Sequence, residues 1–429
     1  MKKNLFKKAG WINNSNVYEV NLRQYTKEGT INAFAASLPR LRKMGVETLW
    51  FMPITPIAQE NKKGSLGSYY ACSSYTAISE EFGTLDDFRQ LVRTAHGMGF
   101  KVILDWVANH TGWGHVWSQT NPDFYKIDEQ TGSFKIASGM DDIIELNYDN
   151  PAMRKAMISA MRFWVDECDI DGFRCDLASW VTLDFWKEAR TELEQVKTLF
   201  WLAEADVLES SSYLEAFDAA YAWTWMHKTE DYNKGKYNMG LLKKLLYEHD
   251  AVCGNESISL WFTSNHDENS WNGTEYEKYG DMLMALNVFS FTWNGMPMIY
   301  SGQELPNYKR LAFFDKDVIT WNGDYSLEDF YTRLLLLKKE NPALRAADEQ
   351  VKTRFFDTPG ETIVYMRQNG DHRVFVWLNF GSSPAEIKLD HEKSPGTYRN
   401  VFTGTSEEFA GTTSHILEPF GYRVFTSVL

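Results

Sequence analysis

Residues 101–107 read KVILDWV, a short apolar run that is interrupted by one acidic residue, Asp105. Such a run is typical of a β-strand whose two faces are both buried. The preceding residues, 84–98, begin with a Thr-Leu-Asp-Asp capping pattern and place Phe88 and Leu91 on one face of an amphipathic helix. A helix followed at once by a buried strand indicates an α/β unit of a parallel sheet.

The same alternation of strand and helix extends in both directions from this segment. Apolar runs predict strands at 17–20, 47–52, 101–107, 171–176, 199–204, 219–223, 258–263 and 298–301. Helical spacing predicts helices at 31–44, 84–98, 151–167, 183–195, 211–217, 239–249, 276–291 and 327–339. Eight strand–helix pairs in this order predict a (β/α)8 TIM barrel. A doubly wound open sheet is the competing α/β architecture, but the first strand–helix turn has no GxGxxG motif.

One connection is much longer than a barrel needs. About 40 residues separate the third predicted strand from the next helix, whereas strand–helix loops usually have about 2–6 residues. We therefore expect a short excursion at residues 111–150, at the mouth of the barrel.

The hydrophobic pattern changes after Asn341-Pro342. Strands are predicted at 362–366, 373–379, 385–389 and 422–426, with turns at Asn369-Gly370 and Pro395-Gly396. These features predict a C-terminal antiparallel β-sandwich domain. The chain is thereby divided into a catalytic barrel, residues 1–345, and a β domain, residues 346–429.

The charge balance excludes several classes of partner. Of the 429 residues, 44 are Lys or Arg and 58 are Asp or Glu, which gives a net charge of −14. Because an acidic surface repels phosphate groups, we expect neither nucleic acid nor a membrane as a partner. Four cysteines lie far apart without a CxxC pair, so neither a zinc site built from cysteines nor a disulfide framework is expected.

The N-terminal sequence favours a cytoplasmic protein. Lys2, Lys3, Lys7 and Lys8 resemble the charged start of a signal peptide, but no apolar core follows them. No apolar run approaches the ~18 residues of a transmembrane helix. A chain already trimmed of its signal peptide would read the same.

Several predicted strands end in charged or imidazole side chains, namely Asp105, the pair Arg174 and Asp176, Glu204, and the pair His266 and Asp267. The C-terminal ends of barrel strands face the active site. Any one of these groups could be a strand-end cap or half of an ion pair. The whole set, placed at different strand ends, indicates an active site.

Local context assigns different chemistry to two of the carboxylates. Arg174 and Asp176 are two residues apart on a strand, so both point into the barrel. Beside an arginine, Asp176 is expected to have a lowered pKa and to stay ionised, as a nucleophile must. Glu204 follows the apolar residues Phe200–Ala203, and an apolar environment raises the pKa of a carboxyl group, which suits a general acid.

Four segments resemble, in the right order, sequence regions of the α-amylase superfamily, glycoside hydrolase family 13. They are DWVANH at 105–110, GFRCD at 172–176, WLAE at 201–204 and FTSNHD at 262–267. Weaker matches are GSYY at 67–70 and MPMIYSGQE at 296–304. The resemblance extends over nearly the whole chain.

The resemblance implies a role for each matched residue. Asp176 would be the nucleophile, Glu204 the general acid/base and Asp267 the stabiliser of the transition state. Substrate-binding roles would fall to Tyr70, Asp105, His110, Arg174 and His266. Together they imply retaining glycoside chemistry through a covalent glycosyl-enzyme.

Some positions depart from the family pattern. Ser179 and Trp180 stand where many α-amylases carry Lys-His, which serve leaving-group binding and, at the second position, calcium binding. Asn109 matches another calcium position, but no complete set of oxygen ligands is recognisable in the sequence. We therefore expect no cofactor and no metal site, with calcium as the alternative that the resemblance raises.

The motifs lead to a hydrolase of α-1,4-glucosidic bonds, with starch-like α-glucans or maltooligosaccharides as its substrates. A 4-α-glucanotransferase or an exo-acting α-glucosidase would share these motifs, which leave endo or exo action, chain length and oligomeric state open. A catalytically inactive, amylase-like binding protein is the alternative of another class, and the three carboxylates argue against it. Trp113 and Trp117 fit sugar platforms and local packing equally well.

Overall fold

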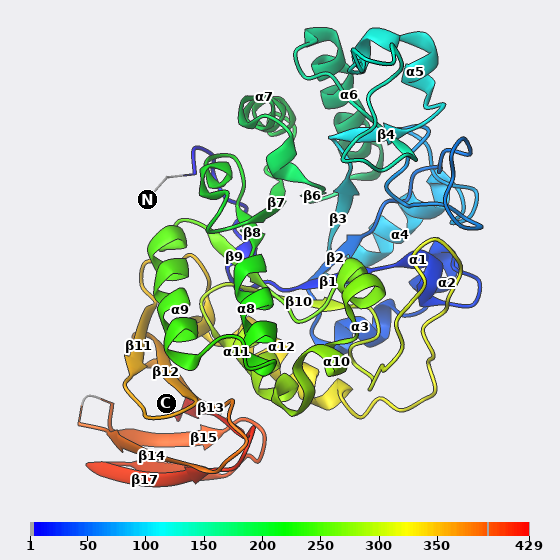
Figure 1. The fold of residues 1–429 in the computed structure, drawn as a ribbon. Helices are drawn as coiled ribbons and strands as arrows, with labels where there is room; N and C mark the ends of the chain where they lie inside the picture. The colour runs from blue at the N-terminus through cyan, green and yellow to red at the C-terminus, as the bar shows by residue number, and fades with distance from the viewer. Residues whose placement is uncertain (1–3, 393, 429) are drawn as a thin grey trace.

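The computed structural model describes residues 4–392 and 394–428, and its centre is a closed barrel of eight parallel strands (Figure 1). In their order around the barrel, the strands are β1 (Val17–Val20), β2 (Thr48–Phe51), β3 (Lys101–Trp106), β6 (Gly172–Cys175), β7 (Phe200–Asp206), β8 (Ala219–Tyr221), β9 (Ile258–Trp261) and β10 (Met296–Tyr300). Parallel pairing of β10 with β1 closes the ring. The predicted (β/α)8 barrel is confirmed.

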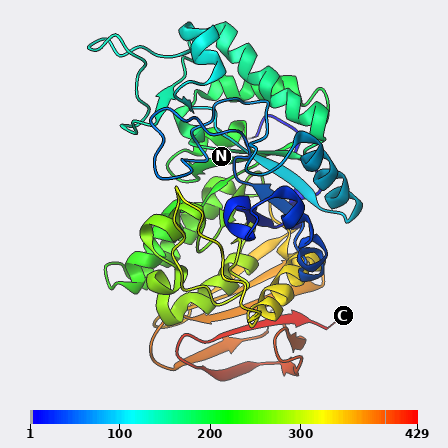
Figure 2. The same ribbon diagram turned by 90° about the vertical axis from the view of Figure 1, so that its right-hand side faces the viewer.

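Helices follow the strands in sequence and lie around the outside of the barrel (Figures 1 and 2). They are α1 (Leu22–Tyr25), α2 (Ile31–Ala35), α3 (Leu38–Met44), α4 (Leu85–Gly97), α6 (Pro151–Cys168), α7 (Leu183–Leu193), α8 (Trp223–Asn233), α9 (Met239–Cys253), α10 (Glu275–Tyr279), α11 (Leu283–Thr292) and α12 (Glu328–Glu340). The predicted capping box of α4 is present, because Thr84 and Asp87 each accept a hydrogen bond from the backbone N–H of the other.

The structure corrects three of the predicted helices and adds one. The helix expected at 31–44 is two helices, α2 and α3, because Pro39 lies in the first turn of α3 and begins a new helix. The helix expected at 276–291 is broken at Gly280, whose φ of 51° ends α10. The segment expected as a helix at 211–217 forms only a 3-10 turn, Ser211–Glu215, and α8 was not predicted at all.

Strand β6 shows how the barrel separates its two faces. Arg174 points into the barrel, whereas Phe173 packs outward with its ring centroid 5.7 Å from that of Trp106. A Cβ atom on Gly172 would lie 2.1 Å from the carbonyl oxygen of Phe200. Glycine at this position therefore allows β6 and β7 to approach closely.

The long connection after β3 forms the excursion at the barrel mouth. It contains the short paired strands β4 (His110–Gly112) and β5 (Ile143–Glu145) and the helix α5 (Val116–Thr120). Trp117 packs against Tyr75, with ring centroids 4.9 Å apart, and Trp113 packs against Phe134. Both tryptophans thus serve local packing.

The C-terminal region is an antiparallel β domain, as predicted. A six-stranded sheet contains β11 (Lys352–Phe356), β12 (Thr362–Asn369), β13 (His372–Asn379), β18 (Tyr422–Ser427), β15 (Gly396–Asn400) and β16 (Ser406–Phe409). A second sheet pairs β14 (Ala385–Asp390) with β17 (Thr412–Leu417), and Trp377 packs between the sheets with Leu389 and Leu417. The other face of the larger sheet packs on the barrel, where Tyr365 Oη lies 2.5 Å from Thr292 Oγ1.

None of the helices in residues 4–392 and 394–428 is long and apolar enough to cross a membrane.

Candidate active site

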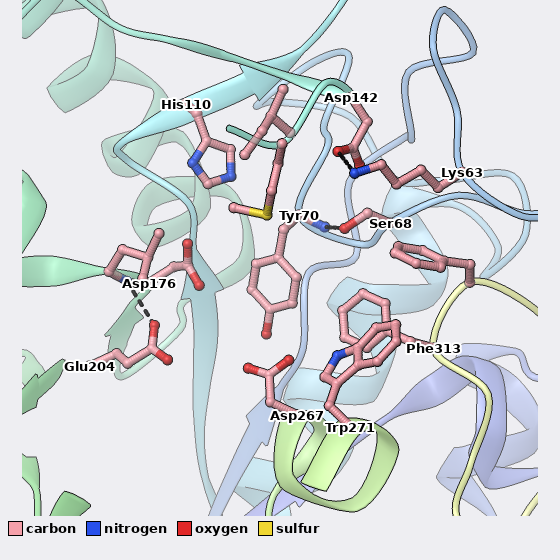
Figure 3. Close-up of a pocket in the computed structure, with 14 residues that line it drawn as sticks. Lys63, Ser68, Tyr70, His110, Asp142, Asp176, Glu204, Asp267, Trp271 and Phe313 are labelled. Atoms are coloured by element: carbon pink, nitrogen blue, oxygen red, sulfur yellow. Dashed lines mark hydrogen bonds and ion pairs between the residues drawn. The ribbon is translucent and has the colours of Figure 1, made fainter. Parts of the chain in front are cut away.

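The three predicted catalytic carboxylates lie in one cavity at the C-terminal ends of the barrel strands (Figure 3). Asp176 directly follows β6, Glu204 is near the end of β7, and Asp267 comes shortly after β9. The cavity has a volume of about 260 Å³. Its lining includes Lys63, Ser68, Tyr70, His110, Met140, Asp142, Ile143, Leu177, Trp271, Phe313 and Phe314.

Arg174 connects the carboxylates beneath this cavity. Its side chain is completely buried, and Nη1 donates hydrogen bonds to Asp105 Oδ1 at 2.9 Å and to Asp176 Oδ1 at 3.0 Å. Nη2 forms an ion pair with Glu204 Oε2 at 3.0 Å, and Nε donates to Tyr221 Oη at 3.2 Å. One guanidinium therefore orients three carboxylates.

The expected lowering of the Asp176 pKa is wrong. Burial and the nearby charge of Glu204 raise the pKa of Asp176 well above its ordinary value, and the attraction of Arg174 only partly opposes this. Burial likewise raises the pKa of Asp105 to about 6. The physical reason is that Arg174 is shared, so its single positive charge cannot stabilise three buried negative charges. The cluster consequently binds a proton more tightly than isolated carboxylates do.

A second buried network holds Asp267. His266 Nδ1 lies 2.5 Å from Glu19 Oε1, and His266 Nε2 lies 3.2 Å from Asp267 Oδ2. Burial alone would lower the pKa of His266, but Asp267 and Glu19 raise it well above its ordinary value. Burial also raises the pKa of Glu19; we assign the shared proton to His266, because both ring nitrogens face carboxyl oxygens.

The imidazolium in turn acts on the third carboxylate. Burial opposes ionisation of Asp267, but the charge and hydrogen bond of His266 lower the pKa of Asp267 below its ordinary value. Asp267 therefore stays ionised more readily than Asp105 and Asp176 do.

Tyr70 and His110 form one wall of the cavity. Tyr70 Oη donates to Asp105 Oδ2 at 3.1 Å, and the Tyr70 ring stacks on the His266 ring with centroids 5.4 Å apart. Burial lowers the pKa of His110 to about 4, so its ring is neutral. The Asn109 amide lies 3.2 Å from His110 Nδ1, whereas His110 Nε2 is buried and has no hydrogen-bond partner within the described chain. This nitrogen is available to a ligand hydroxyl.

Several residues of the site were not predicted. Glu19 carried a signal, because it is a charged residue within a buried apolar strand. Trp271 lies four residues beyond Asp267 and could have been considered with it. Lys63 and Phe313 belong to irregular segments whose sequence carries no pattern that points to the barrel mouth.

The residues around Asn109, which matches a calcium position of the family, do not fit that ion in this chain. Glu145 lines the same shallow cavity as Asn109, and both of its carboxylate oxygens are occupied by ammonium groups, Oε1 by Lys126 at 2.6 Å and Oε2 by Lys135 at 2.9 Å. The Asn109 side chain is directed to His110, although a calcium ion needs about 6–8 oxygen ligands. Across residues 4–392 and 394–428, no group of three or more His, Cys, Asp or Glu side chains is arranged to hold a metal.

Comparison with known proteins finds matches to both domains of the chain. The α-amylase catalytic-domain model matches residues 12–123 and 118–320, and the model of the α-amylase C-terminal all-β domain matches residues 355–421. Alpha-amylase 2 of Dictyoglomus thermophilum is 24% identical over 92% of this chain and 73% of its own length. Alpha-amylase MalA of Haloarcula japonica is 26% identical over 88% of this chain, which spans 57% of that relative.

Solved structures show the same likeness over the full length. An α-amylase from Lactobacillus plantarum superposes with a TM-score of 0.86 and 27% identity, covering 97% of this chain and 99% of that one. The maltogenic α-amylase AmyB from Thermotoga neapolitana gives a TM-score of 0.88, also with 27% identity and the same coverage. Both domains thus agree, and the chain belongs to the α-amylase superfamily, glycoside hydrolase family 13.

Proposed function

We propose that this protein is a retaining glycoside hydrolase that cleaves α-1,4-glucosidic bonds in starch-like glucans or maltooligosaccharides. The observation that carries the proposal is the pairing of Asp176 and Glu204 on the one guanidinium of Arg174, each at 3.0 Å, beside a sugar-sized cavity. Sharing one guanidinium keeps the two carboxyl groups close. This supports the ~5–5.5 Å spacing of retaining enzymes over the wider spacing of inverting enzymes.

In the proposed mechanism Asp176 attacks the anomeric carbon while Glu204 protonates the departing oxygen. The backbone N–H of Leu177 donates to Glu204 Oε2 at 2.8 Å and orients this carboxyl group. The buried cluster holds a proton tightly, and a proton on Glu204 with Asp176 ionised is the distribution that the first step requires. Water then attacks the glycosyl-enzyme, and Glu204 acts as the base.

The remaining residues act on the sugar ring and on its developing charge. Asp267 stays ionised beside His266 and stabilises the positive charge of the oxocarbenium-like transition state. Tyr70 supplies a ring face for stacking, and the free Nε2 of His110 donates to a hydroxyl. Asp105 holds Arg174 and Tyr70 in place from below.

The substrate class draws on the names of the relatives. A cyclomaltodextrinase from a Bacillus species is 25% identical over 82% of this chain, and neopullulanase 2 of Thermoactinomyces vulgaris is 25% identical over 88%. We extend from these names to an α-glucan or maltooligosaccharide substrate here. We also propose that the protein works without a cofactor, in the cytoplasm, and without nucleic-acid or membrane partners, as its net charge of −14 favours.

Two measurements test the proposal. Chromatography of the products from maltoheptaose should show shorter maltooligosaccharides, and longer products would instead indicate a 4-α-glucanotransferase. Proton NMR of the first product should show the α-anomer, whereas initial β-anomer would contradict a retaining mechanism. Failure to cleave any maltooligosaccharide would favour the inactive binding protein.

A further inference from the structure

Two charged residues face each other at the rim of the active-site cavity. Lys63 lies on the segment after β2 and places Nζ 2.9 Å from Asp142 Oδ1 and 3.0 Å from Asp141 Oδ1. Asp142 belongs to the excursion, and its side chain is only 6% exposed. Lys63 and Asp142 both line the cavity that holds the catalytic carboxylates. The ion pair therefore joins two separate loops within the site.

Further contacts make this side of the cavity a continuous wall. Trp113 Nε1 donates to the carbonyl oxygen of Asp141 at 2.8 Å, and Trp113 also forms a backbone bridge with Glu60 of the segment after β2. On the other flank, the N–H of Leu66 donates to the carbonyl oxygen of Phe314 at 3.0 Å. Three loops are thus tied together, and we call their cavity-lining residues Lys63, Met140, Asp142, Phe313 and Phe314 the glycone wall.

The glycone wall and the proposed general acid, Glu204, lie on opposite sides of the cavity. Figure 3 shows Lys63, Asp142 and Phe313 on the side of the cavity away from Glu204. Glu204 protonates the departing oxygen in the proposed mechanism, so the leaving group lies on its side. The glycone wall accordingly faces the sugar that stays with Asp176, and beyond it the non-reducing end of the chain.

The leaving-group side is open by contrast. A second, shallower cavity of about 450 Å³ continues past Glu204 and is lined by Ser179, Asp206, Trp223 and His227 among others. Trp223 is half-buried and stacks on His227 with ring centroids 5.5 Å apart and planes 13° apart. A glucan chain can therefore extend beyond Glu204 but meets a barrier in the opposite direction.

We propose that the enzyme acts in exo fashion, binding the non-reducing end of its substrate against the glycone wall and releasing a short saccharide. This inference rests on the proposed function, which sets the direction of the chain. A cavity of about 260 Å³ is slightly smaller than the ~300–1,000 Å³ of most small-molecule sites, so a short saccharide fills it.

The ion pair gives the wall a means of recognising a chain end. The Lys63 ammonium can donate to, and the Asp142 carboxylate accept from, the free hydroxyls of a terminal glucose. In an internal glucose the oxygen at carbon 4 carries the next sugar, which would clash with the wall.

A pair of substrates tests the direction of attack. One substrate is p-nitrophenyl α-maltopentaoside, and the other is the same compound with a 4,6-ethylidene group on its non-reducing glucose. Chromatography measures the products, which are p-nitrophenyl glycosides with fewer glucose units. We expect kcat/KM on the blocked compound to be lower by about tenfold or more. Similar cleavage of both compounds overturns exo action but leaves the proposed function standing. If neither is cleaved, the proposed function itself fails, and this inference fails with it.

Matched variants test the role of the ion pair. Lys63→Ala and Asp142→Ala should raise the ratio of blocked to free cleavage by about threefold or more. Lys62→Ala is the control, because Lys62 Nζ donates to Gln59 Oε1 and does not line the cavity; its ratio should equal that of the wild type. If the ratio is unchanged in both Lys63→Ala and Asp142→Ala, the ion pair does not recognise the non-reducing end of the substrate.

Discussion

Arg174 Nη1 donates a hydrogen bond to Asp176 Oδ1 at 3.0 Å, and the same nitrogen lies 2.9 Å from a carboxylate oxygen of Asp105. The positive charge of Arg174 is therefore divided between Asp176 and other carboxylates. This relationship explains why burial and Glu204 can raise the pKa of Asp176 although an arginine touches it. It also implies that Asp176 is present for chemistry and is unfavourable for stability at neutral pH.

Asp176→Asn should abolish activity and leave the fold intact. Loss of the nucleophile is expected to lower kcat by about 10⁴-fold or more. The folded-state pKa of Asp176 is raised, so its contribution to stability is full below the ordinary carboxyl pKa and is lost as pH rises through the raised value. Asparagine does not ionise, so the variant does not lose stability in this way as the pH rises. Its melting temperature at pH 7 should therefore exceed that of the wild type by about 1–4 °C.

Calorimetry across a pH series separates these effects. The stabilisation by Asp176→Asn should shrink as the pH falls toward the ordinary carboxyl pKa of about 4. A variant that turns over at a near-normal rate would show that the nucleophile is misassigned. A variant that melts lower at pH 7 would show that Asp176 stabilises the barrel.

Much of this fold could be predicted, because each barrel strand is a buried apolar run followed by a helix. The errors arose where local geometry overrides periodicity, as at Pro39 and Gly280. Helix α8 escaped prediction because its buried residues, such as Trp225 and Thr229, are too few and too mixed in polarity to form a clear stripe.

The candidate site divides in the same way. Asp176, Glu204 and Asp267 could be identified because charged groups at the ends of apolar strands are conspicuous. Lys63 and Phe313 could not, because only tertiary contacts bring their loops together across about 250 residues of sequence. The sharing of Arg174 among three carboxylates is likewise a property of the closed barrel, and the pKa of Asp176 was mispredicted for that reason.

Calcium should be dispensable for stability and activity. Lys126 and Lys135 already neutralise Glu145, and together they lower its pKa despite partial burial. Treatment with EDTA should leave the melting temperature and the reducing-sugar release unchanged. Glu145→Gln should lower stability by about 1 kcal/mol or less, since the lysines are half-exposed. A sharp fall in melting temperature with EDTA, restored by added calcium, would contradict this reading of the loop.

His266→Gln should destabilise the protein in a pH-dependent way. The imidazolium is held by Glu19 and Asp267, which raise the pKa of His266 despite its burial. Its contribution to the free energy of unfolding is therefore full below the ordinary histidine pKa of about 6.5, and it is lost as the pH rises through the raised pKa. We expect a loss of about 1–3 kcal/mol at pH 6, smaller at alkaline pH, by urea denaturation. A loss that is the same at every pH would show that His266 is neutral in the folded state.

Glu204→Gln should separate protonation of the leaving group from the rest of catalysis. Glu204 is oriented by the Leu177 N–H at 2.8 Å and by Arg174 at 3.0 Å, and glutamine has nearly the same shape but cannot transfer a proton. Cleavage of maltooligosaccharides should fall by about 10²–10⁴-fold, the usual contribution of a general acid.

α-Glucosyl fluoride needs no protonation of its leaving group, so formation of the glycosyl-enzyme from it should be nearly unaffected. The acidic limb of that step, which the ionisation of Asp176 sets above the ordinary carboxyl range, should remain in Glu204→Gln. Stopped-flow measurement of fluoride release over a pH series checks the rate and this limb. Fluoride release that falls in Glu204→Gln as far as maltooligosaccharide cleavage does would show that Glu204 does more than donate the proton.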